Sequence, residues 1–187
     1  MEEKNRTILY LAREKEGTKQ ARRALLFWAA DDYAGALGIP KRRWEMGYHG
    51  YGKPFFCNAR EMFFSISHSG GLWGCAFSDG PVGLDIQLCR DCDPVSIAGR
   101  FFHPSEAAAV QKDPSRFFPI WTAKESYIKY LGRGFRENLS AFSVVEGAGI
   151  KPEIRGAVLQ EMDLAAGYCA CLCTEGQKTV AYQWREG

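Results

Sequence analysis

Three acidic residues stand at positions where a carboxylate could take part in chemistry. Asp85 lies in the stretch PVGLDIQ, whose apolar and polar residues alternate as in a strand, so that Asp85 and Gln87 share one face. Glu125 lies in a predicted helix, and Glu106 lies at a helix start between them. Converging carboxylates repel one another unless a cation lies among them, and Mg²⁺ typically uses one or two protein carboxylates together with phosphate oxygens and water. We therefore expect a magnesium-dependent phosphate site.

The stretch WTAKESYIKYLG predicts a helix with one polar stripe. Trp121, Glu125 and Lys129 follow one another at intervals of four residues and therefore lie on one side. A Glu–Lys pair at this spacing is most often a surface pair that contributes about a few tenths of a kcal/mol. The flanking tryptophan and the abrupt LGRG end favour a stripe that lines a crowded site instead.

Basic and hydroxyl side chains could supply the other half of a phosphate site. Arg23, Lys53 in YGKP, and Ser67 with His68 in ISHSG have donors suited to phosphate oxygens. A serine hydrolase is not favoured, because neighbours in a strand point to opposite faces and His68 is then a poor base for Ser67 or Ser69. The chain also has no GxSxG motif.

Short strands and helices must position these residues. The first half predicts an opening strand TILYLA and a helix that begins after Thr18 and ends at Gly38, followed by the strands MFFSIS, LWGCAFS and VGLDI. The second half predicts helices at PSEAAAV and FPIWTAKESYIKYLG, with Gly132 as the stop, and the strands AFSVVE, GYCACLCT and TVAYQWR. We expect an α+β fold.

The repeated order of helical segments and strands predicts two similar halves, residues 1–90 and 91–187. Each half is expected to pack helices on a small, mostly antiparallel sheet. A ligand would then bind in the cleft where the halves meet.

The composition is that of an ordinary globular protein, with 187 residues, 46% hydrophobic and 25% charged. No apolar run approaches the roughly 20 residues that span a bilayer, and no signal-peptide core follows Met1. We expect a soluble, cytoplasmic protein without a membrane partner.

The cysteines predict reduced thiols. Their number, seven, is odd, which fits poorly with a closed disulfide framework. Cys169, Cys171 and Cys173 alternate along one strand and would share one face as small hydrophobic residues. The CRDC stretch at 89–92 is a lone CxxC, and only His103 stands near it as a further zinc ligand, so a metal role is not favoured.

Five motifs together resemble a known family. YGKP, FSISHSGG, VGLDIQ, RFFHPSE and WTAKESYIKYLGRG occur in the order and approximate spacing of the surfactin-synthetase type of 4′-phosphopantetheinyl transferase, over roughly residues 20–145. The resemblance implies a pseudo-dimeric monomer that binds coenzyme A and Mg²⁺ between its halves. It also implies transfer of the phosphopantetheine arm to a serine of an apo acyl or peptidyl carrier protein, with release of adenosine 3′,5′-bisphosphate.

The resemblance assigns the acidic positions to the metal. Asp85 and Glu125 match the metal ligands, and Gln87 stands where the family often has a third acid. Glu106 matches a further acid near the metal. The serine proton would pass to Glu125 directly or to Glu106 through water.

The resemblance assigns other positions to coenzyme A. Lys53 and Pro54 in YGKP, Ser67 and His68 match coenzyme A contacts, with His68 toward the diphosphate. Two further matches are Lys129, at the diphosphate, and Arg23, at the adenosine 3′-phosphate; Lys15 and Lys19 are candidates for additional basic contacts.

Two other classes of function stay open. Another Mg²⁺-dependent enzyme acting on phosphate esters, such as a nuclease or phosphatase, would use the same acids without a carrier protein. A non-catalytic nucleic-acid-binding module would rest on the basic clusters at 19–24 and 41–43. The net charge of only +2 argues against nucleic acid as a partner.

Overall fold

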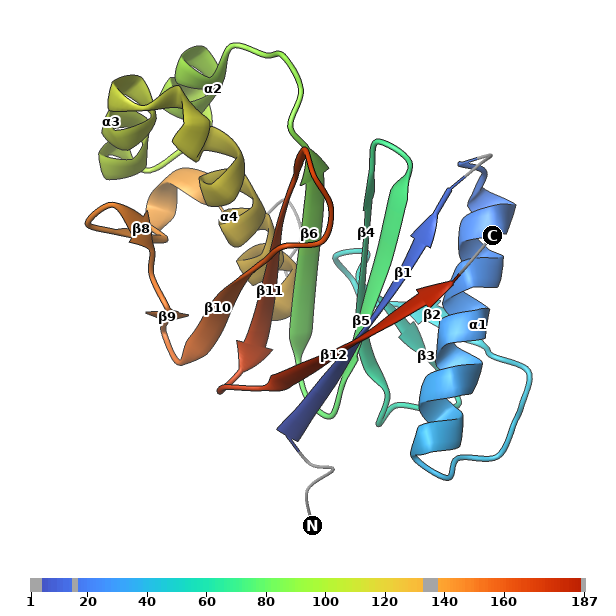
Figure 1. The fold of residues 1–187 in the computed structure, drawn as a ribbon. Coiled ribbons are helices and arrows are strands. Elements are labelled where there is room, and N and C mark those ends of the chain that lie inside the picture. Colours follow the sequence, from blue (N-terminus) through green and yellow to red (C-terminus); the bar gives the residue numbers. More distant parts are fainter. Residues whose placement is uncertain (1–4, 15–16, 133–137, 186–187) are drawn as a thin grey trace.

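The structure is a computed structural model that describes residues 5–14, 17–132 and 138–185. Two four-stranded sheets lie between helix α1 on one side and helices α2 to α4 on the other (Figure 1). The first sheet has the order β12-β1-β5-β4 and the second the order β6-β11-β10-β9. All neighbouring strands are antiparallel except β1 and β12, which are parallel. The predicted α+β class is confirmed.

The elements have the following bounds. The first sheet contains β1 (Arg6–Arg13), β4 (Phe63–Ser69), β5 (Leu72–Ser78) and β12 (Thr179–Arg185). The second contains β6 (Val82–Leu88), β9 (Glu153–Ile154), β10 (Ala157–Met162) and β11 (Tyr168–Glu175). Two short hairpins pair β2 (Met46–Tyr48) with β3 (Pro54–Phe56), and β7 (Val145–Glu146) with β8 (Gly149–Ile150). The helices are α1 (Lys19–Ala36), α2 (Pro94–Phe101), α3 (Pro104–Lys112) and α4 (Phe117–Leu131), with 3-10 turns η2 (Pro114–Arg116) and η4 (Leu139–Ala141).

Helix α1 begins and covers its sheet as its residues predict. The Oγ1 of Thr18 accepts a hydrogen bond from the Ala21 N–H, which satisfies one of the free donors at the helix start. The buried side of α1 includes Tyr33, whose ring stacks on Phe77 of β5 with centroids 4.9 Å apart. This aromatic contact belongs to a core between α1 and the first sheet.

Two more cores hold the remaining layers together. Leu84 and Ile86 of β6 are fully buried against Leu9 and Leu11 of β1, so the two sheets share an apolar core. A further core lies between the second sheet and helices α2 to α4, and it includes Tyr127. The predicted apolar face of VGLDI is therefore the face between the sheets.

The chain crosses between the sheets twice. Strand β6 pairs with β11, with Asp85 opposite Cys171, although β6 lies in the predicted first half. Strand β12 pairs with β1 of the first sheet (Figure 1). The boundary between residues 1–90 and 91–187 therefore does not separate the two sheets. The division into two halves stays a prediction.

A row of serines joins the two sheets at their facing edges. The N–H groups of residues 84, 86 and 88 in β6 donate to the Oγ atoms of Ser65, Ser67 and Ser69 in β4, each over 3.0 Å. Alternation along β4 places these three hydroxyls on one face. They take the place of a neighbouring strand's carbonyls and leave no free donor at these positions of β6.

The structure adds elements that the sequence analysis missed and locates some that it predicted. Helix α2 and strand β10 were not predicted, and AFSVVE forms only the two-residue strand β7. Within the described residues, no helix combines the length and apolar character needed to cross a membrane.

Candidate active site

A glycine lets helix α4 approach β6 closely. A Cβ atom on Gly83 would lie 1.9 Å from the Ser126 carbonyl oxygen and 2.5 Å from the Tyr130 nitrogen. Both are backbone atoms of α4, so no side chain could move aside. Gly83 and Asp85 point to the same face of β6, and this contact brings the polar stripe of α4 toward Asp85.

Asp85 and Lys129 form the centre of the site. The Lys129 ammonium donates to Asp85 Oδ1 over 2.7 Å, and also to Ser67 Oγ and the Leu84 carbonyl. Ser67 donates to the same Asp85 oxygen over 3.2 Å. The Asp85 side chain is 3% exposed and that of Lys129 is 29% exposed, so the ion pair has one open side.

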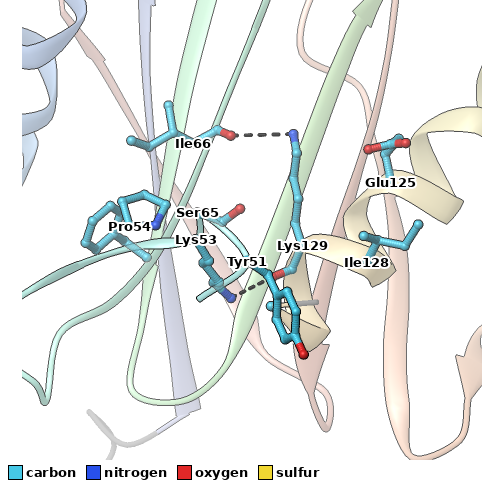
Figure 2. Close-up of a pocket in the computed structure, with 11 residues that line it drawn as sticks. Tyr51, Lys53, Pro54, Ser65, Ile66, Glu125, Ile128 and Lys129 are labelled. Carbon is cyan, nitrogen blue, oxygen red and sulfur yellow. Dashed lines mark hydrogen bonds between the residues drawn. The ribbon is translucent and has the colours of Figure 1, made fainter. Parts of the chain in front are cut away.

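Glu125 adds a second carboxylate one turn before Lys129 on the same stripe of α4. Figure 2 shows it beside Lys129, at the wall of a cavity of about 230 Å³. Burial and the negative charge of Asp85 raise its pKa, and the charge of Lys129 offsets part of that effect. Among the described residues, the Glu125 carboxylate has neither a hydrogen bond nor an ion pair. It is therefore available to a cation or a proton.

The donor set fits a hard divalent cation. Asp85 and Glu125 supply carboxylate oxygens, and their mutual repulsion would be relieved by a metal ion. The Gln87 amide N–H donates to Asp85 Oδ2 over 3.2 Å, while its oxygen accepts from Ser69 over 3.4 Å. Gln87 therefore lies beside Asp85, and a rotation of its amide would turn the oxygen toward the same place. Within the described ranges, no group of three or more His, Cys, Asp or Glu residues forms a ready metal site.

Lys53 occupies a different position from the one expected of a phosphate ligand. Its ammonium donates to the Lys129 carbonyl over 2.6 Å (Figure 2), and to the carbonyls of Val82 and Tyr130 over 2.9 and 3.4 Å. Burial lowers the pKa of Lys53 to about 8, whereas the carbonyl contacts favour its charged form. Lys53 therefore joins the end of α4 to the start of β6 and lines the cavity through its stem.

A second, larger cavity of about 760 Å³ adjoins the first. Pro54 and Ile66 line both cavities, so the two form one cleft. The larger part carries the basic side chains Lys19, Arg22, Arg23, Arg43 and His68, with Glu45 as an acid among them. These basic side chains suit the phosphate groups of a ligand that also reaches the carboxylates of Asp85 and Glu125 at the other end of the cleft.

The two arginines of α1 in this cleft differ in their partners. Arg22 forms an ion pair with Glu14 at 2.5 Å. The guanidinium of Arg23 lies over the ring of Phe27, 5.1 Å from its centroid, and has no ion pair among the described residues. Arg23 is exposed and open to an anion.

His68 lies between the basic cleft and the acidic cluster. Burial lowers its pKa, and the positive charges of Arg22 and Lys129 lower it further, against the opposing effect of Glu14. This environment therefore favours the neutral imidazole. An incoming phosphate would favour the charged form.

Glu106 does not lie with Asp85, Glu125 and Lys129 at the acidic end of the cleft. Its carboxylate accepts from the Val144 N–H at 2.7 Å, from the His103 N–H at 3.1 Å, and forms an ion pair with Lys124 at 2.6 Å. Both charged side chains are 0% exposed. Glu106 lines neither part of the cleft. Its expected place beside the metal is not supported by this position.

The structure thus brings most of the predicted residues together. Asp85, Glu125, Lys129, Ser67 and Gln87 meet at the acidic end; Pro54, Arg23, His68 and Lys19 line the cleft. Lys15 lies outside the described residues. The roles assigned to all of these residues stay predictions.

Some residues of the site were missed. Arg43 and Glu45 line the basic cleft, although the basic cluster at 41–43 was considered only for a nucleic-acid-binding module and not as part of this site. Ser65 and Ser69 join Ser67 in fixing β6, and their spacing of two along FSISHS was the available signal.

The sequence matches one protein family. A family model of the 4′-phosphopantetheinyl transferase superfamily matches residues 81–182. Over 116 residues the chain is 38% identical to a 4′-phosphopantetheinyl transferase of Bacillus subtilis, covering 59% of this chain and 51% of the relative. It is 39% identical over 111 residues to the 4′-phosphopantetheinyl transferase gsp of Aneurinibacillus migulanus, covering 57% and 46%. It is 41% identical over 101 residues to the 4′-phosphopantetheinyl transferase Sfp of Bacillus subtilis strain 168, covering 50% and 44%. The chain spans about half the length of these curated relatives.

Proposed function

Because the chain belongs to the 4′-phosphopantetheinyl transferase superfamily, we propose that it transfers the 4′-phosphopantetheine arm of coenzyme A to a serine of an apo carrier protein. The observation that carries the proposal is the meeting of Asp85, Glu125 and Lys129 at one end of a cleft whose other end is basic. A phosphate ester with several charged groups fits this distribution of charge. Adenosine 3′,5′-bisphosphate is the expected second product.

The basic end of the cleft would bind and orient coenzyme A. Arg23 is open to an anion and is assigned to the adenosine 3′-phosphate, with Lys19 beside it in the cleft. His68 is assigned to the diphosphate, where a negative charge would return its imidazole to the charged form. Such positioning supplies much of the catalysis in phosphoryl transfer.

Asp85 and Glu125 would hold Mg²⁺, with Gln87 as a third oxygen donor or as the holder of a metal-bound water. When bound, Mg²⁺ lowers the barrier by neutralising charge on the diphosphate oxygens. The unpartnered Glu125 carboxylate and the nearby negative charge of Asp85 support this assignment, since a cation between them would relieve their repulsion.

Lys129 and Glu125 divide the remaining chemistry. The Lys129 ammonium has an open side and would stabilise the charge that develops on the diphosphate as its bond to the arm breaks. Glu125, which lines the cavity beside Lys129, would accept the proton of the carrier serine. Glu106 is a weaker candidate, since its oxygens are engaged by Lys124 and backbone N–H groups.

The partner supplies the nucleophile in this scheme. We propose that an apo acyl or peptidyl carrier protein presents its serine at the cavity lined by Glu125 and Lys129. We also propose that the protein acts as a monomer of two similar halves in the cytoplasm. The apolar core shared by the two sheets supports close packing of such halves, while β6 and β12 each pair in the sheet of the other half.

Mass spectrometry of carrier proteins tests the reaction. Apo carriers of fatty acid, polyketide and nonribosomal peptide systems are incubated with the chain, coenzyme A and Mg²⁺, and their intact masses are measured. A gain of one phosphopantetheine arm is expected, and a carrier whose acceptor serine is replaced by alanine should gain nothing. Cleavage of coenzyme A without any gain on the carriers would instead support a hydrolase that acts on phosphate esters.

A further inference from the structure

Two cysteines meet at the end of the strand that carries Asp85. The Sγ atoms of Cys89 and Cys169 lie 3.3 Å apart. Cys89 is exposed and Cys169 is half-buried, whereas Cys75, Cys171 and Cys173 are buried. The sequence analysis expected reduced thiols, with Cys169 as a small hydrophobic residue of a strand, and it did not anticipate that Cys89 and Cys169 would meet.

The strand register holds the two thiols on one face. Cys169 lies opposite Gln87 in the antiparallel pair of β6 and β11, and the Cys89 N–H donates to the Gly167 carbonyl over 2.8 Å. Cys89 and Cys169 are therefore diagonal neighbours across the ladder, on the face that also carries Gln87 and Asp85. A disulfide has its sulfurs about 2.05 Å apart, so the two thiols need to approach by only about one ångström.

Small molecules can reach this position. Cys169 lines a surface cavity of about 400 Å³ together with Thr122 of α4 and Tyr168. The exposed Cys89 is accessible from solvent. A low-molecular-weight disulfide can therefore meet either sulfur without the protein opening.

We propose that Cys89 and Cys169 form a reversible disulfide by exchange with a low-molecular-weight disulfide, which ties the end of β6 to the start of β11. In the first step one cysteine thiolate attacks a sulfur of the small disulfide, whose S–S bond breaks to release one small thiolate. In the second step the other cysteine attacks the first cysteine's sulfur, the protein S–S bond forms and the second small thiolate leaves. Two protein thiols are oxidised, one small disulfide is reduced to two thiols, and the two protons pass to those thiols.

The bond would act on the junction of the two sheets. It would close a loop that contains α2, α3, α4 and β10. Tyr168, next to Cys169, donates through its hydroxyl to the Gly70 carbonyl, in the turn that follows His68. The disulfide would therefore fix β11, the strand whose Tyr168 also contacts the first sheet. The proposal is independent of the reaction assigned to the cleft.

Mapping of disulfides in a glutathione redox buffer tests the proposal. The reduced protein is equilibrated at several ratios of reduced to oxidised glutathione, its free thiols are alkylated, and it is digested without reduction for mass spectrometry. We expect a cross-linked peptide pair that joins Cys89 to Cys169. Cys89→Ser and Cys169→Ala should lose it, while Cys92→Ser and Cys57→Ser, each at another exposed thiol, should keep it.

The competing outcomes decide the proposal. A bond between Cys89 and Cys92 in the CxxC stretch, or single glutathione adducts without a cross-link, would overturn it. Thermal unfolding gives a second measurement. The oxidised native protein should unfold about 5 °C or more above the reduced protein, and Cys169→Ala should show no such shift. An equal midpoint for both redox states of the native protein would contradict the tie between β6 and β11.

Discussion

Helix α4 carries two lysines that each meet a carboxylate, and the two pairs differ in what surrounds them. Lys124 and Glu106 are 2.6 Å apart and 0% exposed, and the Lys124 ammonium also donates to the Phe142 carbonyl. Lys129 and Asp85 are 2.7 Å apart, but the Lys129 side chain is 29% exposed. The first pair lies in the core of the second sheet's helices; the second lies at a cleft.

The difference separates a structural ion pair from groups that can exchange partners. Every oxygen of Glu106 is engaged by the protein, so no ligand can bind there without breaking the core. Glu125, one turn before Lys129 on the cleft-facing stripe, has no such partner among the described residues. Two lysines of one helix thus meet carboxylates in two settings, a closed pair in the core and a partly exposed pair at the cleft for which we propose ligand binding.

Removal of Glu106 should have the largest effect on stability. Glu106→Ala leaves the Lys124 ammonium buried without its counter-charge, and burial already lowers the pKa of Lys124. The free energy of unfolding should fall by about 3–5 kcal/mol in urea titrations. The double variant Glu106→Leu, Lys124→Met removes both charges and should recover most of the loss. A Glu106→Ala protein as stable as the native one would contradict the structural role.

Removal of the Glu125 charge should affect carrier loading strongly and stability little, the opposite of the Glu106 change. Glu125→Gln keeps the shape of the side chain and should change the free energy of unfolding little. Carrier loading should fall by about 10²-fold or more, because both a metal ligand and the proposed base are lost. Binding of coenzyme A should survive in part, as measured by calorimetry. Glu153→Gln, at an exposed position of β9, is the matched control; native carrier loading by Glu125→Gln would refute the assignment.

Arg22 and Arg23 extend the comparison between paired and available charges to the basic end of the cleft. Arg23→Ala should reduce discrimination between coenzyme A and its 3′-dephospho analogue by about 10-fold, because a charged hydrogen bond to the 3′-phosphate is lost. Arg22→Ala breaks an internal ion pair with Glu14 and should leave more of this discrimination in place. The ratio of dissociation constants for the two ligands is the measurement. Equal ratios for Arg23→Ala and the native protein would remove Arg23 from the 3′-phosphate.

The smallest expected effect concerns the pH dependence of binding at His68. Burial lowers its pKa, and a bound phosphate would raise it by favouring the imidazolium. Coenzyme A should therefore bind more tightly as the pH falls through the pKa of the bound state, by about fivefold from pH 8 to 6. His68→Asn should flatten this part of the profile. A native profile without any change across this range would show that His68 takes up no proton on binding.

Local patterns predicted several parts of the fold and the site well. The alternation in VGLDIQ predicted the polar face of Asp85 and Gln87, and the spacing of four residues in α4 predicted its partly exposed stripe. The Thr18 cap and the end of α4 at Gly132 followed from short-range chemistry, since Gly132 adopts a φ of 68° that favours glycine.

The two missed elements differ in their local signals. Strand β10 reads AVLQEM, a run of good helix formers, and it is a strand because it pairs with β11 along its length. Helix α2 has eight residues and includes Gly99. Pairing with β11 overrides the propensity of β10, whereas α2 did carry a local start signal, the Asp93 cap followed by Pro94.

The sequence by itself determined which side chains share a face and which residue types are available, because periodicity and capping act over a few residues. Only the tertiary structure decided which partner each charge receives. Glu106 meets Lys124 across 18 positions, Lys129 meets Asp85 across 44, and Lys53 meets the end of α4 across 76. Pairing at such separations depends on how whole sheets and helices pack, and Gly83 permits the close packing of α4 on β6.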